Sequence, residues 1–211
     1  MKTVILIRHG ESTTNVSKIF TGQLDTPLTE TGMKQAQLMA AYLDRFQIEK
    51  VYASTLSRAC ETAAAIVNRQ RCPMETCDAF REINAGNWQG LSFEEISEKY
   101  TDTYRCWKEN LGKAHPDGGE SCSSLYNRVI SQLLKIVEDT PEQTVCIVTH
   151  ATPIRMIESY ISGGCVEYAQ NISWVPNASA SVYHYDGVFH PVIRGYCGYL
   201  GDMLTNLPKT I

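Results

Sequence analysis

The sequence lacks any apolar run long enough to cross a membrane. Met1–Thr3 leads directly into four apolar residues, Val4–Ile7, which are too few for the core of a signal peptide, and no small-residue cleavage site follows them. We therefore expect no membrane segment and no secretion signal, and we expect the protein to be cytoplasmic.

Paired cysteine motifs are also absent. None of the eight cysteines forms a C-x-x-C pair, and without a secretion signal their even number does not indicate a disulfide framework. Free thiols are therefore expected, whereas a zinc site or a thioredoxin-like redox centre is not. Cys146 lies within an apolar run and is predicted to be a core residue. The cysteines are Cys60, Cys72, Cys77, Cys106, Cys122, Cys146, Cys165 and Cys197.

An excess of positive charge is missing as well. The chain has 19 Lys and Arg against 23 Asp and Glu, a formal net charge of −4, so we do not expect the basic surface that nucleic acids require. Hydrophobic residues (43%) and charged residues (20%) occur at the levels of a globular protein. Because these 211 residues contain no repeat and no linker, we expect a single domain over residues 1–211.

What the sequence does contain is a set of cationic side chains placed after predicted strands. The run Val4–Ile7 is predicted to be a buried strand, and Arg8 and His9 follow it directly. Arg58 follows a second short apolar run, and His150 follows a third. Because ligands bind outside the carboxyl ends of parallel strands, these side chains are expected to line one crevice. Arginine bonds two phosphate oxygens at once and stays charged, so the expected ligand is a phosphate.

Helical periodicity alternates with these strands. Thr29 is predicted to cap a helix that runs to about Phe46, and a second helix is predicted from about Leu56. The predicted inward-facing residues of the first helix are Met33, Ala36, Met39, Ala40 and Leu43. This order of strands and helices predicts an α/β fold, a three-layer α/β/α arrangement with a mostly parallel central sheet.

The segment from about Asn87 to Gly119 has weaker periodicity and is predicted to be a small helical insertion over the active-site crevice. A long amphipathic helix is predicted from Ser121 to Pro141, and residues 181–194 are predicted to form a hairpin. The aromatic residues of the insertion either line a pocket or belong to the core, and both readings stay open. They are Trp88, Phe93, Tyr100, Tyr104 and Trp107.

Four sequence blocks, in the right order and covering nearly the whole chain, resemble the histidine phosphatase superfamily. This family has the phosphoglycerate mutase-like fold, and the resemblance is to its phosphatase branch. The blocks are Arg8-His9-Gly10 with Gly22–Gly32, Ser54–Ala63, Arg81-Glu82-Ile83 with Gly86, Trp88 and Gly90, and Thr149-His150.

The resemblance implies a metal-independent phosphomonoesterase that needs no cofactor and acts on a small phosphorylated metabolite through a phosphohistidine intermediate. His9 would be the nucleophile, and Glu82 would protonate the leaving alkoxide and then activate the attacking water. Arg8, Arg58 and a protonated His150 would hold the phosphoryl oxygens and neutralise the charge that gathers on them.

Further phosphate contacts are implied for Asn15 and for the backbone N–H of Ala151. Many relatives have glycine after the second histidine, so Ala151 leaves less room beside the leaving group and affects the shape of the substrate. Glu11 and Ser57 match motif positions but are expected to position loops. Residues 119–121, at the head of the long helix, are a further candidate for anion binding.

Three other functions are weighed against hydrolysis. Cofactor-dependent phosphoglycerate mutases carry Glu-Arg-His-Tyr where this chain has Arg81–Asn84, so mutase-type phosphoryl transfer is disfavoured. A non-catalytic phospho-ligand binding module would lack the nucleophile or the acid, and both His9 and Glu82 are present. A metal-dependent hydrolase using both histidines predicts loss of activity with a chelator, which we do not expect.

The expected partner is a small phosphomonoester substrate and neither a nucleic acid nor a membrane. Sugar phosphates, nucleotide phosphates, the nucleotide-loop phosphate of a cobalamin precursor and phosphoserine all stay open as substrates. The oligomeric state is open too, with a homodimer as one alternative.

Overall fold

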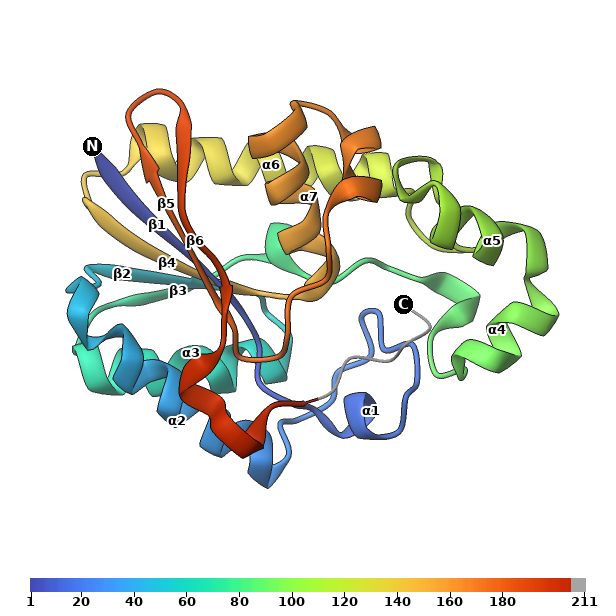
Figure 1. The fold of residues 1–211 in the computed structure, drawn as a ribbon, viewed down its shortest axis with the longest axis horizontal. Coiled ribbons are helices and arrows are strands. Elements are labelled where there is room, and N and C mark those ends of the chain that lie inside the picture. Colours follow the sequence, from blue (N-terminus) through green and yellow to red (C-terminus); the bar gives the residue numbers. More distant parts are fainter. Residues whose placement is uncertain (206–211) are drawn as a thin grey trace.

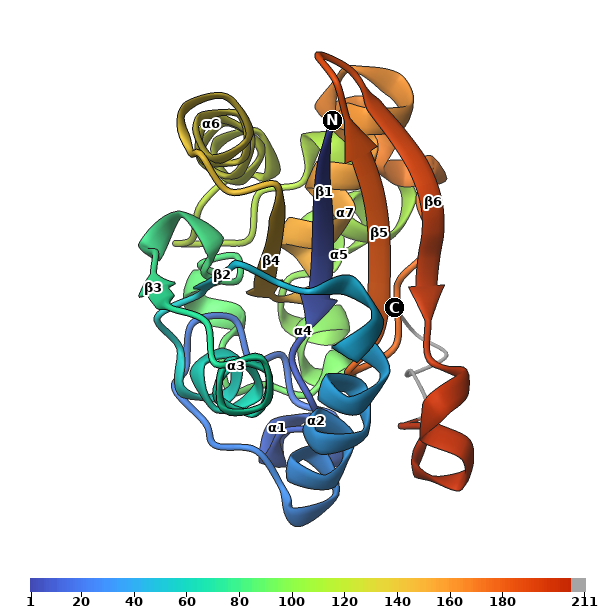
Figure 2. The same cartoon turned by 90° about the vertical axis from the view of Figure 1, so that its left-hand side faces the viewer.

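The computed structural model describes residues 1–205, which form one six-stranded sheet with helices on both faces (Figures 1 and 2). The strands are β1 (Lys2–Arg8), β2 (Lys50–Ala53), β3 (Met74–Thr76), β4 (Thr144–Thr149), β5 (Ala180–Tyr185) and β6 (Phe189–Tyr196). Their order is β3-β2-β4-β1-β5-β6. β1 to β4 pair in parallel, whereas β5 and β6 pair antiparallel. The predicted mostly parallel, three-layer α/β/α fold is confirmed, and so is the hairpin. A single domain over 1–211 includes residues outside the described range and stays a prediction.

The helices alternate with the parallel strands and lie in two layers. The α-helices are α1 (Thr13–Val16), α2 (Glu30–Tyr42), α3 (Ser57–Gln70), α4 (Phe93–Lys99), α5 (Thr101–Glu109), α6 (Cys122–Asp139) and α7 (Ala151–Gly163). The 3₁₀ helices are η1 (Leu43–Phe46), η2 (Asp78–Phe80), η3 (Gly86–Trp88), η4 (Leu111–Lys113), η5 (Val166–Asn171) and η6 (Gly198–Met203). No helix in residues 1–205 is both long and apolar enough to span a membrane.

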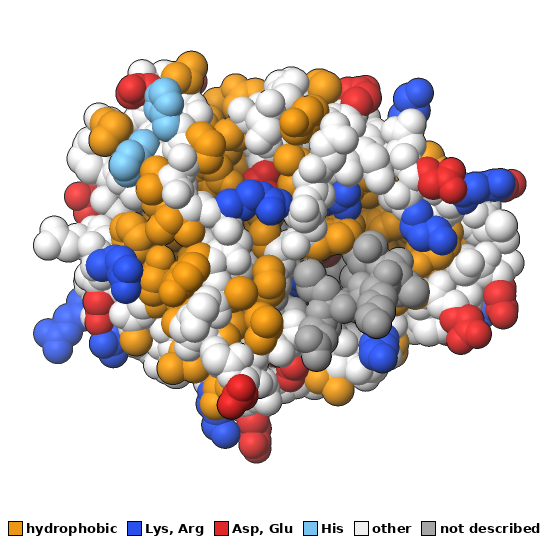
Figure 3. Space-filling model, viewed as in Figure 1, with side chains coloured by type: hydrophobic (Ala, Val, Ile, Leu, Met, Phe, Trp, Pro, Cys, Tyr) orange, Lys and Arg blue, Asp and Glu red, His pale blue; other side chains and the backbone are white. Residues whose placement is uncertain are grey.

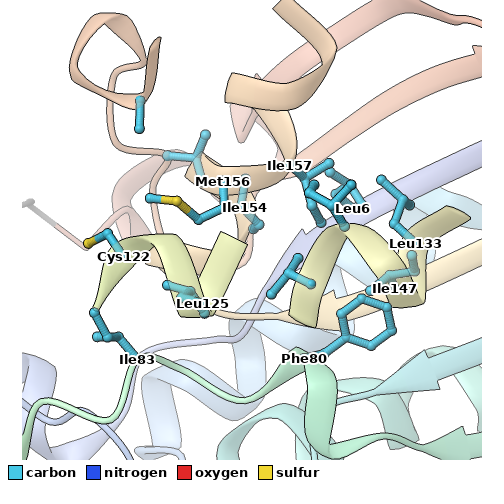
Figure 4. Packing of buried hydrophobic residues seen from close by; sticks show 14 of the residues in the cluster. Leu6, Phe80, Ile83, Cys122, Leu125, Leu133, Ile147, Ile154, Met156 and Ile157 are labelled. Carbon is cyan, nitrogen blue, oxygen red and sulfur yellow. The ribbon is translucent and has the colours of Figure 1, made fainter. Parts of the chain in front are cut away.

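The alternating side chains of β1 belong to two separate cores. Val4 and Leu6 pack on the layer of α6 and α7, while Ile5 and Ile7 pack on the layer of α2 and α3. Figure 4 shows Leu6 of the sheet beside Leu133 of α6. Each such burial stabilises the fold by about 1.5–3 kcal/mol, so the sheet that carries the strand ends is held from both faces.

The inward face of α2 differs from its prediction at one position. Ala36, Met39, Ala40 and Leu43 are buried as expected, but the Met33 side chain is 50% exposed, so that prediction is wrong. Gly32 takes the inward position in this first turn, because a Cβ there would lie 2.0 Å from the carbonyl oxygen of Glu11. The close approach fixes the loop after Arg8-His9-Gly10 against the start of α2.

Both edge strands of the sheet, β3 and β6, are partly exposed. On the face shown in Figure 3, hydrophobic side chains gather over the β5–β6 hairpin. Val192 and Tyr196 of the edge strand β6 are about half exposed, at 52% and 43%. The carboxyl ends of β1 and β4 lie in the middle of the sheet, where neighbouring strands shield them on both sides.

Candidate active site

The two predicted catalytic histidines lie side by side. β1 and β4 are neighbouring parallel strands whose register pairs Arg8 with Thr149, so the next residues, His9 and His150, leave the sheet together. The backbone N–H of His9 donates to the Thr149 carbonyl at 3.0 Å, and the imidazole centroids are 5.0 Å apart. Both side chains are buried.

The His9 imidazole is oriented by its two ring nitrogens. Nδ1 lies 2.7 Å from the Gly10 carbonyl oxygen, which can only accept, so Nδ1 carries the proton. Nε2 therefore bears the lone pair, and it accepts from Nε of Arg58 at 3.3 Å. Burial, followed by the charges of Arg58 and Arg8, lowers the pKa of His9 well below its usual range. The ring is a neutral imidazole whose Nε2 is unprotonated, which is what a nucleophile requires.

Two buried arginines meet at this histidine. Arg58 donates through Nη1 to the Leu24 carbonyl and through Nη2 to the Gly22 carbonyl, each at 2.8 Å, while Arg8 donates through Nη1 to the Val175 carbonyl at 2.6 Å. Burial lowers the pKa of each arginine to about 10, so both remain charged at neutral pH. Within the described chain neither forms an ion pair, and Nε of Arg8 is buried without a hydrogen-bond partner. Two fixed cations that form no ion pair suit a phosphate dianion.

The surroundings of His150 disfavour the protonated state that the resemblance implies. Burial, followed by the charge of Arg58, lowers the pKa of His150 well below its usual range. Nε2 of His150 lies 2.7 Å from Ser54 Oγ, which also accepts from the backbone N–H of Leu56 at 3.3 Å. The Ser54 proton is thus available to Nε2, which leaves the proton of the neutral ring on Nδ1. Nδ1 is buried with no partner in the described chain.

The predicted acid Glu82 is half-buried on the same pocket as His9. Its Oε1 accepts from its neighbour Ile83 N–H at 2.9 Å, and its Oε2 accepts from Thr152 N–H, in the first turn of α7, at 3.3 Å. The carboxylate is thereby held over the start of the helix that follows His150.

An arginine that sequence reasoning missed fixes the loop around Glu82. Nη1 of Arg128, on α6, donates to the carbonyls of Ala79 and Arg81 at 2.7 and 2.9 Å, and Nη2 donates to the Glu82 carbonyl at 3.0 Å. Nη2 also pairs with the Glu120 carboxylate at 2.6 Å. Nothing in the sequence marks α6 as part of the site, because all of these contacts are long-range.

Residues 119–121, the further candidate for anion binding, contact other parts of the chain. Glu120 holds the acid loop, since its Oε1 also accepts from Asn84 N–H at 2.7 Å. Ser121 caps α6 by accepting from Ser124 N–H at 3.1 Å, which satisfies one of the N–H groups at that helix terminus.

Asn15 lies on the pocket with its amide group oriented. Its Oδ1 accepts from Ser12 N–H and from Asn177 Nδ2, both at 3.0 Å, so the Asn15 NH₂ remains for the pocket. Asn177 is buried and also donates to the carbonyls of His9 and Gly10 at 3.1 and 3.3 Å. Its only sequence signal is a polar residue just before a strand.

The remaining motif residues divide as expected between pocket and loops. Ala151 lines the pocket as the first residue of α7. Glu11 accepts from the Thr29 hydroxyl at 2.8 Å, and the backbone N–H of Ser57 donates to Asp25 at 2.8 Å, so Glu11 and Ser57 tie loops together.

A second, larger cavity adjoins the phosphate pocket. The pocket around His9 has a volume of about 80 Å³, whereas the adjoining cavity has about 890 Å³. Phe93, Trp107 and Trp174 line both. The insertion therefore supplies part of the wall, and Trp174 is a wall residue that sequence reasoning missed.

Some aromatic residues of the insertion line a cavity and others belong to the core. Phe93 and Trp107 line both cavities, and Tyr104 lines the larger one. Trp88 is fully buried and packs edge-on against Phe20, so it is a core residue. Among residues 1–205 no cluster of three or more His, Cys, Asp or Glu side chains is placed to hold a metal ion.

Comparison with known sequences agrees with the four blocks. A family model described as the histidine phosphatase superfamily (branch 1) matches residues 4–193. The chain is 37% identical to phosphoserine phosphatase 1 of Hydrogenobacter thermophilus over 213 aligned positions, covering 100% of both chains. It is 33% identical to a metal-independent phosphoserine phosphatase of Arabidopsis thaliana, covering 86% of this chain and 75% of that one.

Comparison with solved structures gives the same fold. YhfR of Bacillus stearothermophilus superposes with a TM-score of 0.89 at 26% identity, covering 95% of this chain and 100% of that one. A mycobacterial glucosyl-3-phosphoglycerate phosphatase superposes with a TM-score of 0.85 at 26% identity, covering 92% and 98%.

Proposed function

This chain belongs to the histidine phosphatase superfamily (branch 1) and is a phosphomonoester hydrolase, and we propose that it hydrolyses O-phosphoserine without a metal through a phosphohistidine at His9. One observation carries the choice of His9. Its unprotonated Nε2 accepts from Nε of Arg58, in a buried pocket whose two arginines form no ion pair within residues 1–205. The named activity of two relatives supports phosphoserine as the substrate.

The first half of the reaction transfers the phosphoryl group to His9. Nε2 attacks phosphorus in line, the N–P bond forms, and the ester P–O bond breaks. Glu82, which must carry a proton at this moment, gives it to the departing alkoxide and releases serine.

The second half regenerates the enzyme. Glu82, now a carboxylate, takes a proton from a water molecule that attacks phosphorus on the side the serine left. The N–P bond breaks, the electron pair of that bond returns to Nε2 of His9, and inorganic phosphate forms.

The fixed donors stabilise the transition state in both halves. Arg8 and Arg58 neutralise the charge on the phosphoryl oxygens, and a neutral His150 contributes its Nδ1–H. The Asn15 amide and the Ala151 N–H add uncharged donors. Each such donor contributes about 3–4 kcal/mol where it is aimed at developing charge.

The test is a pair of assays on the purified enzyme. Inorganic phosphate release from L-phosphoserine is measured with and without EDTA, beside conversion of 3- to 2-phosphoglycerate in the presence of 2,3-bisphosphoglycerate. We expect release that EDTA does not change. Efficient phosphoglycerate conversion with negligible release would instead establish mutase-type transfer.

A cytoplasmic location is also part of the proposal. It is supported by the eight cysteines, which are all free thiols in a chain of ordinary domain size. Fractionation of cells is expected to place the phosphoserine phosphatase activity with cytoplasmic marker enzymes, and activity in a secreted fraction would contradict this.

A further inference from the structure

One buried arginine outside the phosphate pocket has no carboxylate partner. Arg155 of α7 is only 7% exposed, and it forms no ion pair within residues 1–205. Other arginines of this layer are paired, as Arg194 is with the buried Glu158 at 2.6 Å. Burying a charge without a partner is costly, so an unpaired guanidinium here calls for an explanation.

The contacts of Arg155 hold it in place and leave one end free. Nε donates to the Ala169 carbonyl at 2.9 Å, Nη2 lies 3.4 Å from the Gln170 carbonyl, and Cζ lies 4.3 Å from the ring centroid of Trp174. Nη1 donates to no described residue. Arg155 lines the 890 Å³ cavity, and Nη1 keeps its hydrogen-bonding capacity for a ligand there.

Arg155 shares its environment with the two phosphate-pocket arginines. Like Arg8 and Arg58, it is buried, bonded to backbone carbonyls and unpaired. Burial lowers its pKa to about 10, so it remains charged at neutral pH. Because Arg155 has the same surroundings as Arg8 and Arg58, we expect it to bind an anion as well.

The position of Arg155 connects this cation to the reaction. It stacks on Trp174, which lines both cavities. It also follows His150 by five residues on one helix, a rise of about 7.5 Å along the axis. A leaving group that extends past Trp174 into the larger cavity therefore enters the space that Arg155 lines.

The other charged residues of the cavity are unlike Arg155. Lys108 and Glu94 line it too, but both are exposed, and Lys108 lies over the Tyr104 ring at 5.1 Å. Exposed charges in water contribute little to binding. Among these three charged residues of the cavity wall, Arg155 is the one whose side chain is already removed from water before a ligand binds.

We propose that Arg155 binds a carboxylate on the leaving group, so that the enzyme selects phosphate esters of small hydroxy acids and hydroxy amino acids over esters of neutral or purely cationic alcohols. The inference rests on the proposed phosphatase function and deepens it. A second phosphate group on the substrate is also an anion that an arginine can bind, and the experiment distinguishes a carboxylate from a second phosphate.

The first experiment uses the wild-type enzyme and varies the ester. L-phosphoserine and 3-phosphoglycerate both carry a carboxylate, whereas phosphoethanolamine keeps the amine and lacks the carboxylate. We expect kcat/KM for the two carboxylates to exceed that for phosphoethanolamine by about 10- to 100-fold, the range of a charge-assisted hydrogen bond. Equal values would overturn the proposal, and so would a preference for a bisphosphate that lacks a carboxylate, such as fructose 1,6-bisphosphate.

The second experiment changes the arginine. Arg155→Met is expected to raise KM for L-phosphoserine and to lower its kcat/KM, relative to that for p-nitrophenyl phosphate, by about tenfold or more, with Arg155→Lys restoring part of the ratio. Arg69→Met, at an exposed pair with Asp44, is the matched control and is expected to leave both substrates unaffected.

Three outcomes decide between the possibilities. An unaltered substrate ratio in Arg155→Met means that Arg155 only supports the fold. If this variant does not fold, the wild-type comparison decides alone. Absence of phosphate release by the wild type from both L-phosphoserine and p-nitrophenyl phosphate overturns the phosphatase proposal itself, and this inference with it.

Discussion

The phosphate pocket and the cavity beside it are built in different ways. Arg8, His9 and His150 lie at the ends of central parallel strands and Arg58 lies in the first turn of α3, and all four are at most 6% exposed. The cavity is about ten times larger and is walled by α4, α5, α7 and η5, none of which belongs to the sheet. The contrast indicates that the sheet fixes the reaction while the surrounding helices select the ester.

The strongest test of this division is removal of the nucleophile. His9→Gln keeps a polar side chain but cannot form the phosphoenzyme, so kcat should fall by about 10⁴-fold or more for every ester. Initial rates with L-phosphoserine and p-nitrophenyl phosphate check this. Substantial turnover of either ester by the variant would show that the pocket does not act as one unit.

Loss of the acid should depend on the leaving group. Glu82→Gln is expected to lower kcat/KM for L-phosphoserine by about 10²- to 10⁴-fold, because a serine alkoxide needs a proton. The effect on kcat/KM for p-nitrophenyl phosphate, which reports transfer to His9, should be much smaller, since nitrophenolate leaves without a proton. Equal losses for both esters would contradict the acid role.

Arg128 is expected to act through the position of Glu82. Arg128→Gln removes three hydrogen bonds to carbonyls of the acid loop, and we expect kcat/KM for L-phosphoserine to fall by roughly tenfold, with the same leaving-group dependence as Glu82→Gln. A uniform fall for both esters would indicate a purely structural role. Arg69→Gln is the control, as its side chain is half exposed.

The smallest effect concerns stability at mild acid pH. The pKa values of His9 and His150 are lowered by burial, so below about pH 6.5 the unfolded chain binds protons that the folded chain does not. Stability is therefore full above this pH and is lost as pH falls, by up to about 1.4 kcal/mol per pH unit for each histidine. Thermal melts from pH 7 to 5 should show the decline, and a shallower one in His150→Gln. Identical slopes would contradict the buried, neutral state of His150.

The sequence predicts the pocket far better than the cavity for a physical reason. Arg8, His9 and His150 each follow a buried strand directly, so local pattern and parallel pairing suffice to bring them together. Arg155 and Trp174 become wall residues only through the packing of η5 and the insertion, which no local pattern encodes.

Electrostatics and long-range contacts account for the other differences. The resemblance implies a protonated His150, whereas complete burial and the charges of two arginines lower the pKa of this side chain. The acid loop was placed correctly, but its support by Arg128 and Glu120 depends on side chains that are distant in sequence.

The central claim is tested most directly by trapping the intermediate. The enzyme is mixed with ³²P-labelled L-phosphoserine, quenched within milliseconds under alkaline conditions, and digested for peptide mapping. We expect label that is stable to alkali and lost in acid, on the peptide that contains His9, with none in His9→Gln. Steady turnover of the wild type with no such label on His9 would contradict the mechanism.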